Sequence, residues 1–430
     1  MKKAALHNLG CKVNAYETEA MQQMLEAAGY EIVPFNEPAD VYVVNTCSVT
    51  NMADRKSRQM LHKAKKNNPD SIVVATGCYV QTSEQEALED LSIDIVIGNN
   101  RKHELVSLIE EFAKDNVLDI NHEKQEFEEL FVSQTAEHTR AFIKVQDGCN
   151  QFCSYCIIPY ARGRVRSRKL ENVIEEVMRL ASNGYKEVVL TGIHLSSYGV
   201  DFEDKTDLLA LIQAVNRVDG IERIRLGSLE PKIVTEEFAS ALSQMPKVCP
   251  HFHLSLQSGC DATLKRMNRR YTAEEYETGC QLLRKYFKHP AITTDVIVGF
   301  PGESDEEFEI TKQFLKKIHF YEMHIFKYSK RKGTRAAVMQ DQVAEQIKTG
   351  RSAELISLGN EMSDEFRMYY TGKIKDVLFE EKVEINGKSY YTGYTKEYVK
   401  VAKESEETLE NQIIEGKITG RLTDDIYIMR

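Results

Sequence analysis

The stretch Gly148-Cys149-Asn150-Gln151-Phe152-Cys153-Ser154-Tyr155-Cys156 sets the expectation for the whole chain. Three cysteines fall within eight residues, separated by three and then by two residues. A strand-like run, Phe142 to Gln146, precedes them, so they are expected on a loop at the carboxyl end of a strand. Three thiolates at this spacing can hold three irons of a 4Fe–4S cluster and leave the fourth iron open to a substrate or a cofactor.

Zinc and reduced structural thiols are the alternatives for this stretch. Zinc sites usually combine paired C-x2-C elements with four ligands, and no fourth Cys or His lies nearby in the sequence. Structural thiols give no reason for three cysteines to share one short loop. The spacing therefore favours a cluster over both alternatives.

C-x3-C-x2-C with an aromatic residue, Tyr155, before the last cysteine resembles the motif of the radical S-adenosylmethionine (SAM) enzymes. The resemblance implies that Cys149, Cys153 and Cys156 hold a 4Fe–4S cluster whose open iron is chelated by the amino and carboxylate groups of SAM. It also implies that an electron from the cluster splits the sulfonium to give a 5′-deoxyadenosyl radical, with Tyr155 packed near the adenine. The motif is specific for the superfamily and leaves the substrate open.

Composition limits the classes to which this chain can belong. It has 430 residues, a formal net charge of −10 and nine cysteines. An odd number of cysteines argues for metal ligation over a disulfide framework, and the acidic charge argues against non-specific coating of nucleic acid. No run of eighteen apolar residues occurs, and the first seven residues form no apolar signal-peptide core, so we expect a cytoplasmic protein with no membrane partner.

Three apolar runs in residues 1–118 begin at Ala4, Val41 and Ile72, and helical patterns lie between them. Each run leads to a cysteine: Cys11, Cys47 and Cys78. Strands that alternate with helices predict a doubly wound parallel sheet with right-handed crossovers. The carboxyl ends of such strands meet at one edge, where sites form. The three cysteines are therefore expected to converge, although more than thirty residues separate each from the next.

Buried apolar thiols, which are common in α/β cores, are the alternative for these three cysteines. Against it, each cysteine lies past its strand in a loop, and two of them follow Gly10 and Gly77. The forms Leu-Gly-Cys-Lys-Val-Asn (9–14), Asn-Thr-Cys-Ser-Val (45–49) and Gly-Cys (77–78) resemble the N-terminal domain of the methylthiotransferases. The resemblance implies an auxiliary 4Fe–4S cluster, so that one cluster makes the radical and the other holds sulfur.

Residues 119–139 are polar and acidic without a clear period, and they predict a solvated connector. Residues 140–369 then repeat a strand-and-helix pattern. The predicted strands cover residues 142–146, 187–191, 223–226, 252–256, 293–298 and 323–327. Six βα units are too few to close an eight-stranded barrel, and the radical SAM resemblance implies an open, partial (βα)6 TIM-like barrel with its site at the C-terminal ends of the strands.

Polar residues and glycines follow the predicted strands, as a cofactor site requires. Glycine lets the backbone approach a ligand closely, and Ser, Gln and Asp side chains can hydrogen-bond to it. By resemblance, Tyr155 and five further residues are expected to contact SAM: Ser228, Ser255, Gln257, Arg266 and Asp295. For each of them a strand-end cap or a loop contact is the alternative. The three remaining cysteines (249, 260 and 280) lack cluster spacing and are expected to be ordinary thiols.

Basic residues gather after several predicted strands. Such runs are usually solvated faces, but beside strand ends in an acidic protein they favour a rim that guides a polyanion to the site. The residues expected to contact RNA follow the cluster loop and the last central strand: Arg162, Arg164, Arg166, Lys330, Arg331 and Lys332.

Residues 370–430 hold five short alternating runs, at 372–379, 389–395, 398–402, 412–419 and 422–428. They predict a small antiparallel barrel, which resembles the RNA-binding TRAM module. Ten basic and twelve acidic residues in this region give no sign of an RNA binder by composition alone. Its tyrosines (390, 391, 394 and 398) either stack on bases or pack the barrel.

Taken together, the motifs resemble the radical SAM methylthiotransferase family over nearly the whole chain, and most closely its subgroup that acts on threonylcarbamoyladenosine in tRNA. The resemblance implies addition of a methylthio group to C2 of the modified adenosine next to the anticodon, with two 4Fe–4S clusters and two SAM molecules. An aromatic C–H bond has no useful acidity, so a radical cofactor must activate it. The implied partners are tRNA with threonylcarbamoyladenosine, a reductant protein of the flavodoxin or ferredoxin type, and a sulfur donor.

Other functions remain open at this point. Within the same chemistry, the substrate is alternatively isopentenyl-adenosine in tRNA or a ribosomal-protein aspartate. A protein of a different class, an RNA-binding iron–sulfur sensor without turnover, also accounts for the cysteines.

Overall fold

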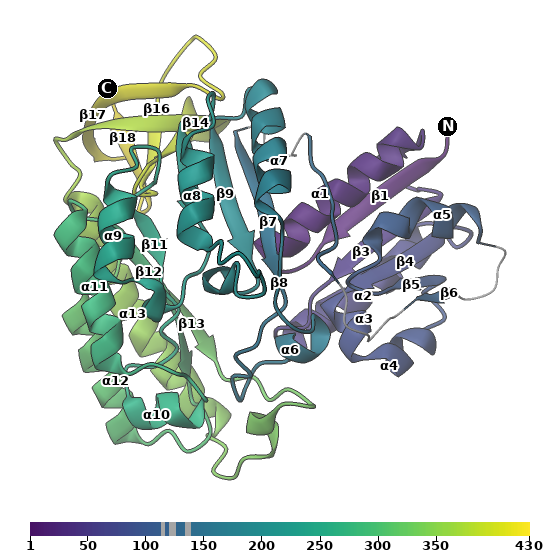
Figure 1. The fold of residues 1–430 in the computed structure, drawn as a ribbon, viewed down its shortest axis with the longest axis horizontal. Helices are drawn as coiled ribbons and strands as arrows, with labels where there is room; N and C mark the ends of the chain where they lie inside the picture. The colour runs from purple at the N-terminus through teal and green to yellow at the C-terminus, as the bar shows by residue number, and fades with distance from the viewer. Residues whose placement is uncertain (113–116, 120–125, 134–138) are drawn as a thin grey trace.

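The computed structural model describes residues 1–112, 117–119, 126–133 and 139–430. Figure 1 shows an N-terminal α/β layer beside a larger central α/β layer, with a small β-barrel near the amino ends of the central strands.

The N-terminal part is a six-stranded, all-parallel sheet in the order β2-β1-β3-β4-β5-β6. Its elements are β1 (Lys3–Asn8), α1 (Lys12–Ala27), β2 (Glu31–Ile32), β3 (Val41–Thr46), α2 (Asn51–Asn67), β4 (Ile72–Gly77), α3 (Cys78–Thr82), α4 (Glu84–Leu88), β5 (Ile95–Ile97), α5 (Leu105–Glu110) and β6 (Val117–Asp119). Alternate residues of β3 face opposite sides: Val41 and Val43 pack towards α1 and α5, whereas Tyr42 and Val44 pack towards α2, α3 and α4. The expected parallel sheet with helices on both faces is confirmed.

The connector between the first two layers differs from expectation where it is described. Leu130 and Val132 are buried against Tyr16 and Ala20 of α1, and Val132 donates its backbone N–H to the buried Glu176 at 2.8 Å. The prediction of a solvated connector is therefore wrong for this segment, because its apolar residues alternate and fill the seam between the layers. The remainder of residues 119–139 lies largely outside the described chain.

Six parallel strands form the inner wall of the central layer. The first three and the last three pair as β7-β9-β10 and β11-β12-β13, and single bridges, Ile224 to Val248 and Leu229 to Leu254, join the two sets. A two-residue strand, β8, pairs antiparallel with β7. The strands are β7 (Arg140–Asp147), β8 (Arg166–Ser167), β9 (Glu187–Gly192), β10 (Arg223–Leu226), β11 (His251–His253), β12 (Ala291–Val298) and β13 (Glu322–Lys327).

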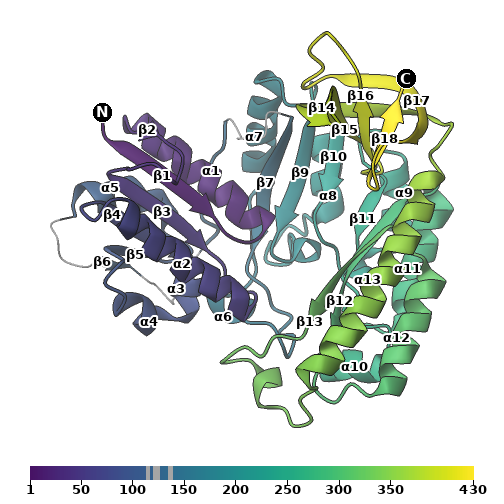
Figure 2. The ribbon, with the colours of Figure 1, turned by 180° about the vertical axis from the view of Figure 1, so that it is seen from behind.

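Helices cover the outside of these strands and share one apolar core with them. They are α7 (Leu170–Ser182), α8 (Leu208–Asn216), α9 (Glu236–Ser243), α10 (Asp261–Arg266), α11 (Ala273–Tyr286), α12 (Asp305–Ile318) and α13 (Glu345–Met368). The short helix α6 (Ile158–Ala161) lies apart from them and contacts α3. Figure 2 shows α13 running along β13. β11 is shorter than predicted, since pairing beyond His253 continues only as single bridges, Leu254 with Leu229 and Gln257 with Val296.

The last five strands form a closed barrel in the order β14-β15-β16-β18-β17. They are β14 (Ile374–Ile385), β15 (Lys388–Thr395), β16 (Lys400–Lys403), β17 (Ile413–Arg421) and β18 (Ile426–Met429). β16 and β18 pair in parallel, which corrects the expectation of a wholly antiparallel barrel. The barrel core continues into Phe366 of α13, Tyr370 just after this helix and Tyr321, so this barrel is packed on the central layer.

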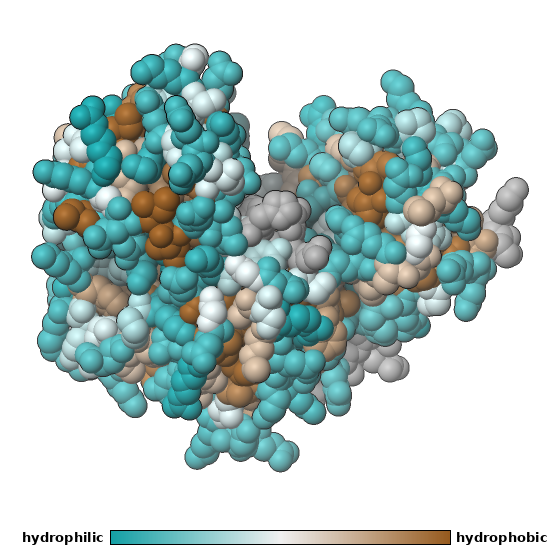
Figure 3. Space-filling model, turned by 90° about the horizontal axis from the view of Figure 1, so that it is seen from above, coloured by the Kyte–Doolittle hydropathy of each residue, from teal (hydrophilic) through white to brown (hydrophobic). Residues whose placement is uncertain are grey.

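Among the described helices, none combines the length and apolar character needed to cross a bilayer. The face seen in Figure 3 is mostly hydrophilic, with apolar side chains in small separate groups.

Candidate active site

The first cysteine group lies at the carboxyl edge of the N-terminal sheet. Cys11 follows β1, Cys47 follows β3 and Cys78 follows β4, and these strands are neighbours in the sheet. A Cβ at Gly10 would lie 2.9 Å from the sulfur of Cys47, so the loop that carries Cys11 lies directly against Cys47. The side-chain amide of Asn14 ties the loops together, because Nδ2 donates to the carbonyls of Leu9 at 2.8 Å and Thr46 at 3.0 Å. The structure thus brings these three cysteines together.

Burial makes two thiols of this group weaker acids than usual. Cys47 and Cys78 are buried and Cys11 is exposed. Burial, together with the neighbouring thiolates of Cys78 and Cys11, raises the pKa of Cys47 to about 11. Burial likewise raises the pKa of Cys78, although Arg162 opposes this. A cationic iron group would hold these sulfurs in the ionised form that ligation requires.

Arg162 lies between the two cysteine groups. Its Nε donates to the sulfur of Cys78 at 3.4 Å, and its Nη atoms donate to both carboxylate oxygens of Glu17 at 2.9 and 3.1 Å. Nη1 also lies 3.2 Å from Asp147, whose Oδ1 accepts the backbone N–H of Gly148 at 2.7 Å. A buried network of charges therefore runs from the loop of Cys78 to the residue before Cys149.

Two lysines complete this network. Lys144 lies 2.7 Å from both Glu17 and Asp147, and Lys102 lies 3.4 Å from Glu17. All five side chains are almost fully buried. Burial opposes ionisation of Glu17, but the three cations outweigh it and hold the pKa of this carboxyl below its ordinary range. The carboxylate of Glu17 is thus charged, and basic side chains surround it beside the cysteines.

The second cysteine group occupies the loop between β7 and α6, as expected. The segment around Asn268 fixes the loop: Ser154 donates its N–H to the carbonyl of Met267 at 2.9 Å, and Asn268 donates to the carbonyl of Phe152 at 2.9 Å. Phe152 has a left-handed backbone (φ 51°), which turns the loop between its first two cysteines. Arg269 donates to the sulfur of Cys153 at 3.2 Å. Burial raises the pKa of Cys149 to about 11 and that of Cys156 to about 12.

Both groups fit a cluster better than a single zinc ion. Tetrahedral zinc with Zn–S bonds of about 2.3 Å requires sulfurs about 3.8 Å apart. Among the described residues, three ligand atoms of His, Cys, Asp or Glu come within 4.8 Å of one another only in the group of His253, Asp295 and His324. Neither cysteine triad converges that tightly. Three soft thiolates at a wider spacing are the donor set of a 4Fe–4S cluster with one open iron.

A cavity of about 690 Å³ lies inside the central strands and reaches the first cysteine group. Its lining comes from all three parts of the chain: Gly10, Cys11, Lys12, Val13, Arg140, Phe142, Val189, Thr191, Gly192, Arg225, Leu226, Gly227, Ser228, His251, His253, Thr293, Asp295, Glu322, His324 and Tyr398. Cys11 thus opens onto the same space as the strand ends. The cavity is large enough for a nucleoside or small cofactor.

The predicted SAM contacts divide into two groups. Ser228 and Asp295 line the cavity, and Tyr155 packs against Phe300 beside the cluster loop with ring centroids 6.4 Å apart. Gln257 is buried with a left-handed backbone (φ 70°), and its N–H donates to the carbonyl of Asp295 at 2.8 Å.

The other two predicted SAM contacts have structural partners. The carbonyl of Ser255 accepts from the hydroxyl of Tyr271 at 2.7 Å. Arg266 pairs with Glu307 and donates to the carbonyls of Pro301 and Gly302 at 3.2 and 3.1 Å. These two residues are not brought into the cavity by the structure.

Three of the six predicted RNA contacts are exposed and three are buried. Arg164, Lys330 and Lys332 are exposed. The other three, Arg162, Arg166 and Arg331, are buried, so their assignment to an exposed RNA-binding rim is corrected: a buried, paired guanidinium is not available to a phosphate.

Each of these three arginines has protein partners. Arg162 belongs to the network above, Arg166 donates to Asn100 at 2.9 Å, and Arg331 donates to Ser48 at 2.6 Å and pairs with Asp54. Their partners come from the N-terminal layer, so these arginines join the two layers.

Several cavity residues are absent from the sequence-based predictions. His253 and His324 lie within strands, where side chains of alternate residues face the cavity. Tyr398 stacks on His251 with ring centroids 4.9 Å apart and so closes one end of the cavity from the C-terminal barrel. The alternation of His251 with His253 and of Glu322 with His324 is the signal that marks them, since apolar residues are expected on a purely structural inner face.

The expectation that the C-terminal tyrosines divide between packing and stacking can also be compared with the structure. Tyr390 and Tyr391 are buried in the barrel. Tyr394 and Tyr398 stack on each other at 4.5 Å, with Arg140 over both rings.

Comparisons with known proteins agree with this architecture. Residues 143–315 match the radical SAM superfamily, and residues 3–98 match the uncharacterized protein family UPF0004. The structure of the radical SAM methyltransferase TsrM from Kitasatospora setae, with tryptophan and a SAM analog bound, superposes with a TM-score of 0.57 at 16% identity, over 79% of this chain and 75% of that chain. At this identity the likeness concerns the fold alone.

Curated relatives cover nearly the whole chain. The threonylcarbamoyladenosine tRNA methylthiotransferase MtaB of Bacillus subtilis (strain 168) is 42% identical over 423 residues, which are 97% of this chain and 94% of that protein. The MtaB of Aquifex aeolicus (strain VF5) is 41% identical over 93% of this chain and 98% of that protein. A tRNA-2-methylthio-N(6)-dimethylallyladenosine synthase of Pelotomaculum thermopropionicum is 36% identical over 98% of this chain and 96% of that protein. The chain belongs to the radical SAM tRNA methylthiotransferase family.

Proposed function

We propose that this protein adds a methylthio group to C2 of N6-threonylcarbamoyladenosine next to the anticodon of tRNA. The observation that carries the proposal is that two three-cysteine groups are joined by one buried charge network, and that charged side chains line the cavity onto which Cys11 opens. The relatives named for this reaction support the substrate, with 42% and 41% identity.

We assign the six cysteines to two cluster sites. Cys149, Cys153 and Cys156 would hold the 4Fe–4S cluster that binds SAM, and Cys11, Cys47 and Cys78 would hold an auxiliary 4Fe–4S cluster. When bound, these groups supply the radical and sulfur chemistry that no protein side chain offers. We also expect Tyr155, Ser228, Ser255, Gln257 and Arg266 to shape the SAM site, with Ser228 in the cavity wall.

The chain itself orders and shields the reaction space. The six parallel strands suit a partial TIM-like barrel, in which strand ends form the site. Gly192 and Gly227, where β9 and β10 end, have no side chain that would fill the cavity. The buried network around Arg162 holds the N-terminal layer against the cluster loop. A rigid contact between the layers would keep the two proposed cluster sites at a constant separation, as catalysis by proximity requires.

The charged side chains in the cavity wall favour the threonylcarbamoyl substrate over the dimethylallyl one. Charged side chains from several elements line it, among them Arg140, Asp295 and Glu322. Burial raises the pKa of Glu322, as expected for a carboxyl held in a space with little solvent. A substituent with hydroxyl, carbonyl and carboxylate groups offers polar side chains of this wall further hydrogen bonds, which an apolar five-carbon substituent does not.

RNA binding and electron supply follow from the same assignment. The C-terminal barrel suits a TRAM-like module, and the exposed Arg164, Lys330 and Lys332 suit phosphate contacts. The domains would be an N-terminal cluster domain (1–118), a connector (119–139), a radical SAM domain (140–369) and the barrel (370–430). A cytoplasmic setting, a flavodoxin- or ferredoxin-type reductant and a sulfur donor complete the proposal.

A reconstituted assay tests this function. Anticodon stem-loops that carry threonylcarbamoyladenosine or isopentenyl-adenosine are incubated with the anaerobically reconstituted protein, SAM, sulfide and dithionite, and nucleosides are identified by mass spectrometry. We expect a methylthio product on the first stem-loop, and none when either cysteine triad is changed to alanine. Product on the isopentenyl stem-loop alone would overturn the substrate assignment. Absence of both 5′-deoxyadenosine and methylthio product would favour a sensor.

A further inference from the structure

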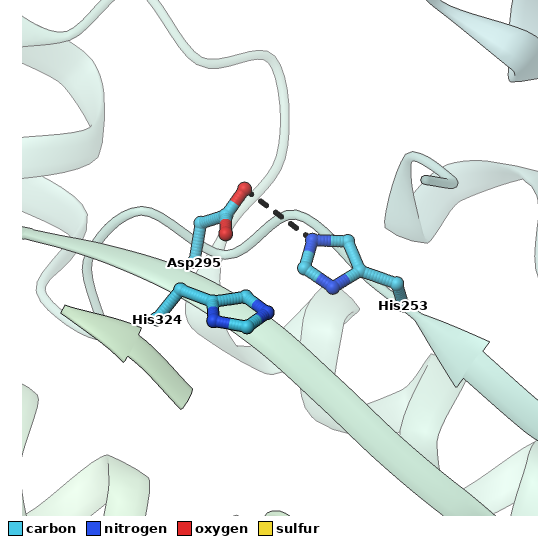
Figure 4. A group of neighbouring side chains, drawn as sticks. All are labelled: His253, Asp295 and His324. Carbon is cyan, nitrogen blue, oxygen red and sulfur yellow. Dashed lines mark ion pairs between the residues drawn. The ribbon is translucent and has the colours of Figure 1, made fainter. Parts of the chain in front are cut away.

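Three cavity residues stand on three neighbouring parallel strands. His253 is on β11, Asp295 on β12 and His324 on β13. Asp295 and His324 are direct partners in the register of β12 and β13, and His253 is the partner of Thr293, two residues before Asp295. Residues two apart on a strand share a face. Regular strands therefore hold all three side chains towards one point, as Figure 4 shows.

One ring nitrogen of this group, Nε2 of His253, is available to hydrogen-bond a ligand. Nδ1 of His253 lies 3.0 Å from the hydroxyl of Thr293, which fixes its ring. Nε2 of His253 is buried and 3.3 Å from Oδ2 of Asp295, yet it makes no hydrogen bond of good geometry within the described chain. The rings of His253 and His324 stack with centroids 5.9 Å apart. A buried ring nitrogen without a good partner is unfavourable, and a ligand atom can provide that partner.

The group also lies within reach of the first cysteine site. The cavity that it lines contains Cys11 and Lys12 as well, and Tyr398 and His251 close another part of the wall. The cysteine site and the group of His253, Asp295 and His324 thus line one cavity. The latter group is distinct from both cysteine triads.

We infer that His253, Asp295 and His324 form the subsite that binds the polar N6 substituent of the substrate adenosine through its hydroxyl, carbonyl and carboxylate oxygens. The inference rests on the proposed function and identifies its specificity-determining residues. Imidazole N–H groups donate to these oxygens, and the carboxylate of Asp295 accepts from a hydroxyl or an amide N–H. A site built for hydrogen bonds rejects an analogue that lacks them far more strongly than an apolar pocket rejects an extra group.

Binding and turnover with variant proteins test the subsite. His253→Leu, His324→Leu and Asp295→Asn are compared with His62→Leu, which changes a half-exposed histidine on the surface of α2. For each reconstituted protein we measure iron content, 5′-deoxyadenosine formation, and the dissociation constants of stem-loops with threonylcarbamoyladenosine, isopentenyl-adenosine or adenosine. Unchanged iron content and unchanged melting temperature establish that a variant is folded.

The expected result is a change in discrimination. The unaltered protein and His62→Leu should bind the threonylcarbamoyl stem-loop at least about 100-fold more tightly than the isopentenyl one, and the two histidine-to-leucine variants should lower this ratio about tenfold or more. Their kcat/KM for the threonylcarbamoyl substrate should fall in parallel. Equal weakening for all three stem-loops, with the ratio unchanged, would overturn the inference.

Two further outcomes separate neighbouring explanations. The same three ligand atoms lie close enough for one divalent cation, so stoichiometric Co²⁺ binding that is lost in these variants, in a background with both cysteine triads changed to alanine, would overturn the inference in favour of a metal site. If the unaltered protein favours the isopentenyl stem-loop in both binding and turnover, the proposed function fails. If it modifies the threonylcarbamoyl stem-loop and the variants do so with unaltered discrimination, only the subsite fails.

Discussion

The guanidinium of Arg162 donates from Nε to the sulfur of Cys78 at 3.4 Å. Its other nitrogens bind Glu17 and approach Asp147. One buried side chain thus contacts a cysteine of the N-terminal group and a carboxylate that holds the loop of Cys149. Hydrogen bonds to cluster sulfurs and nearby positive charge both raise a cluster's reduction potential, so Arg162 would tune the proposed auxiliary cluster as well as join the layers.

Arg162→Met should destabilise the protein by about 3–5 kcal/mol, because it leaves the buried carboxylates of Glu17 and Asp147 short of a cation. Urea unfolding of the cluster-free chain measures this change. Arg164→Met is the matched control, since Arg164 follows two residues later and is exposed. Equal stability of the two variants would show that the network contributes little.

Gly10→Ala should reduce the iron content of the reconstituted protein from about eight towards about four atoms per chain, if each site holds a 4Fe–4S cluster. The added Cβ would lie 2.9 Å from the sulfur of Cys47, in a backbone with φ of 115°.

Gly29→Ala is the control for this variant. Gly29 also has a positive φ, of 85°, but a Cβ there has nothing within 4 Å. Both variants thus strain the backbone, but only Gly10→Ala brings a Cβ against the sulfur of Cys47. Iron loss of the same size in both would attribute the effect to strain.

Lys330→Met and Lys332→Met should each weaken tRNA binding and lower the slope of log K against log salt by about one. Arg331→Met, between them, should leave the slope unchanged and lower the melting temperature, because Arg331 is buried against Ser48 and Asp54. Filter binding at several salt concentrations separates the two effects. A reduced slope for Arg331→Met would show that Arg331 contacts the RNA after all.

Glu187→Gln should destabilise the chain at neutral pH by about 3 kcal/mol, since Glu187 is a buried partner of Arg225, with Oε1 2.7 Å from Nε. Burial opposes ionisation of Glu187, but Arg225 outweighs it and holds the pKa below its ordinary value of 4.5. A lowered folded-state pKa gives stability that is present above pH 4.5 and lost as the pH falls through the folded value. The difference between the two proteins should therefore shrink in acid below that pH. A constant difference from pH 7 down to about 3 would contradict the assignment.

Much of the N-terminal site was predictable because strand and loop patterns are local. Each apolar run indicates a strand, parallel strands bring their carboxyl ends to one edge, and Cys11, Cys47 and Cys78 follow from that rule alone. The cluster loop after β7 was predictable for the same reason.

The buried arginines were not predictable from local sequence. Arg162 sits in a run of basic residues, which is typical of a solvated face, but its partner Glu17 is 145 residues away. Only the packing of α1 on the central layer reveals the pair. The parallel pairing of β16 with β18 was missed because hairpin patterns predict pairing between successive strands, whereas β17 lies on the far side of β18.

His253 and His324 were missed although their alternation within strands was visible. A histidine in a strand is ordinarily a packed or surface residue, and only the register with Asp295 shows that the three side chains converge.

Nucleoside mass spectrometry of tRNA from cells with and without this gene tests the central claim most directly. The account predicts that the methylthio form of threonylcarbamoyladenosine disappears without the gene, that threonylcarbamoyladenosine accumulates, and that the methylthio form of isopentenyl-adenosine is unchanged. The gene restores the modification, and a copy with Cys149, Cys153 and Cys156 changed to alanine does not. An unchanged level of methylthio-threonylcarbamoyladenosine in cells that have no other source of the activity would contradict the account.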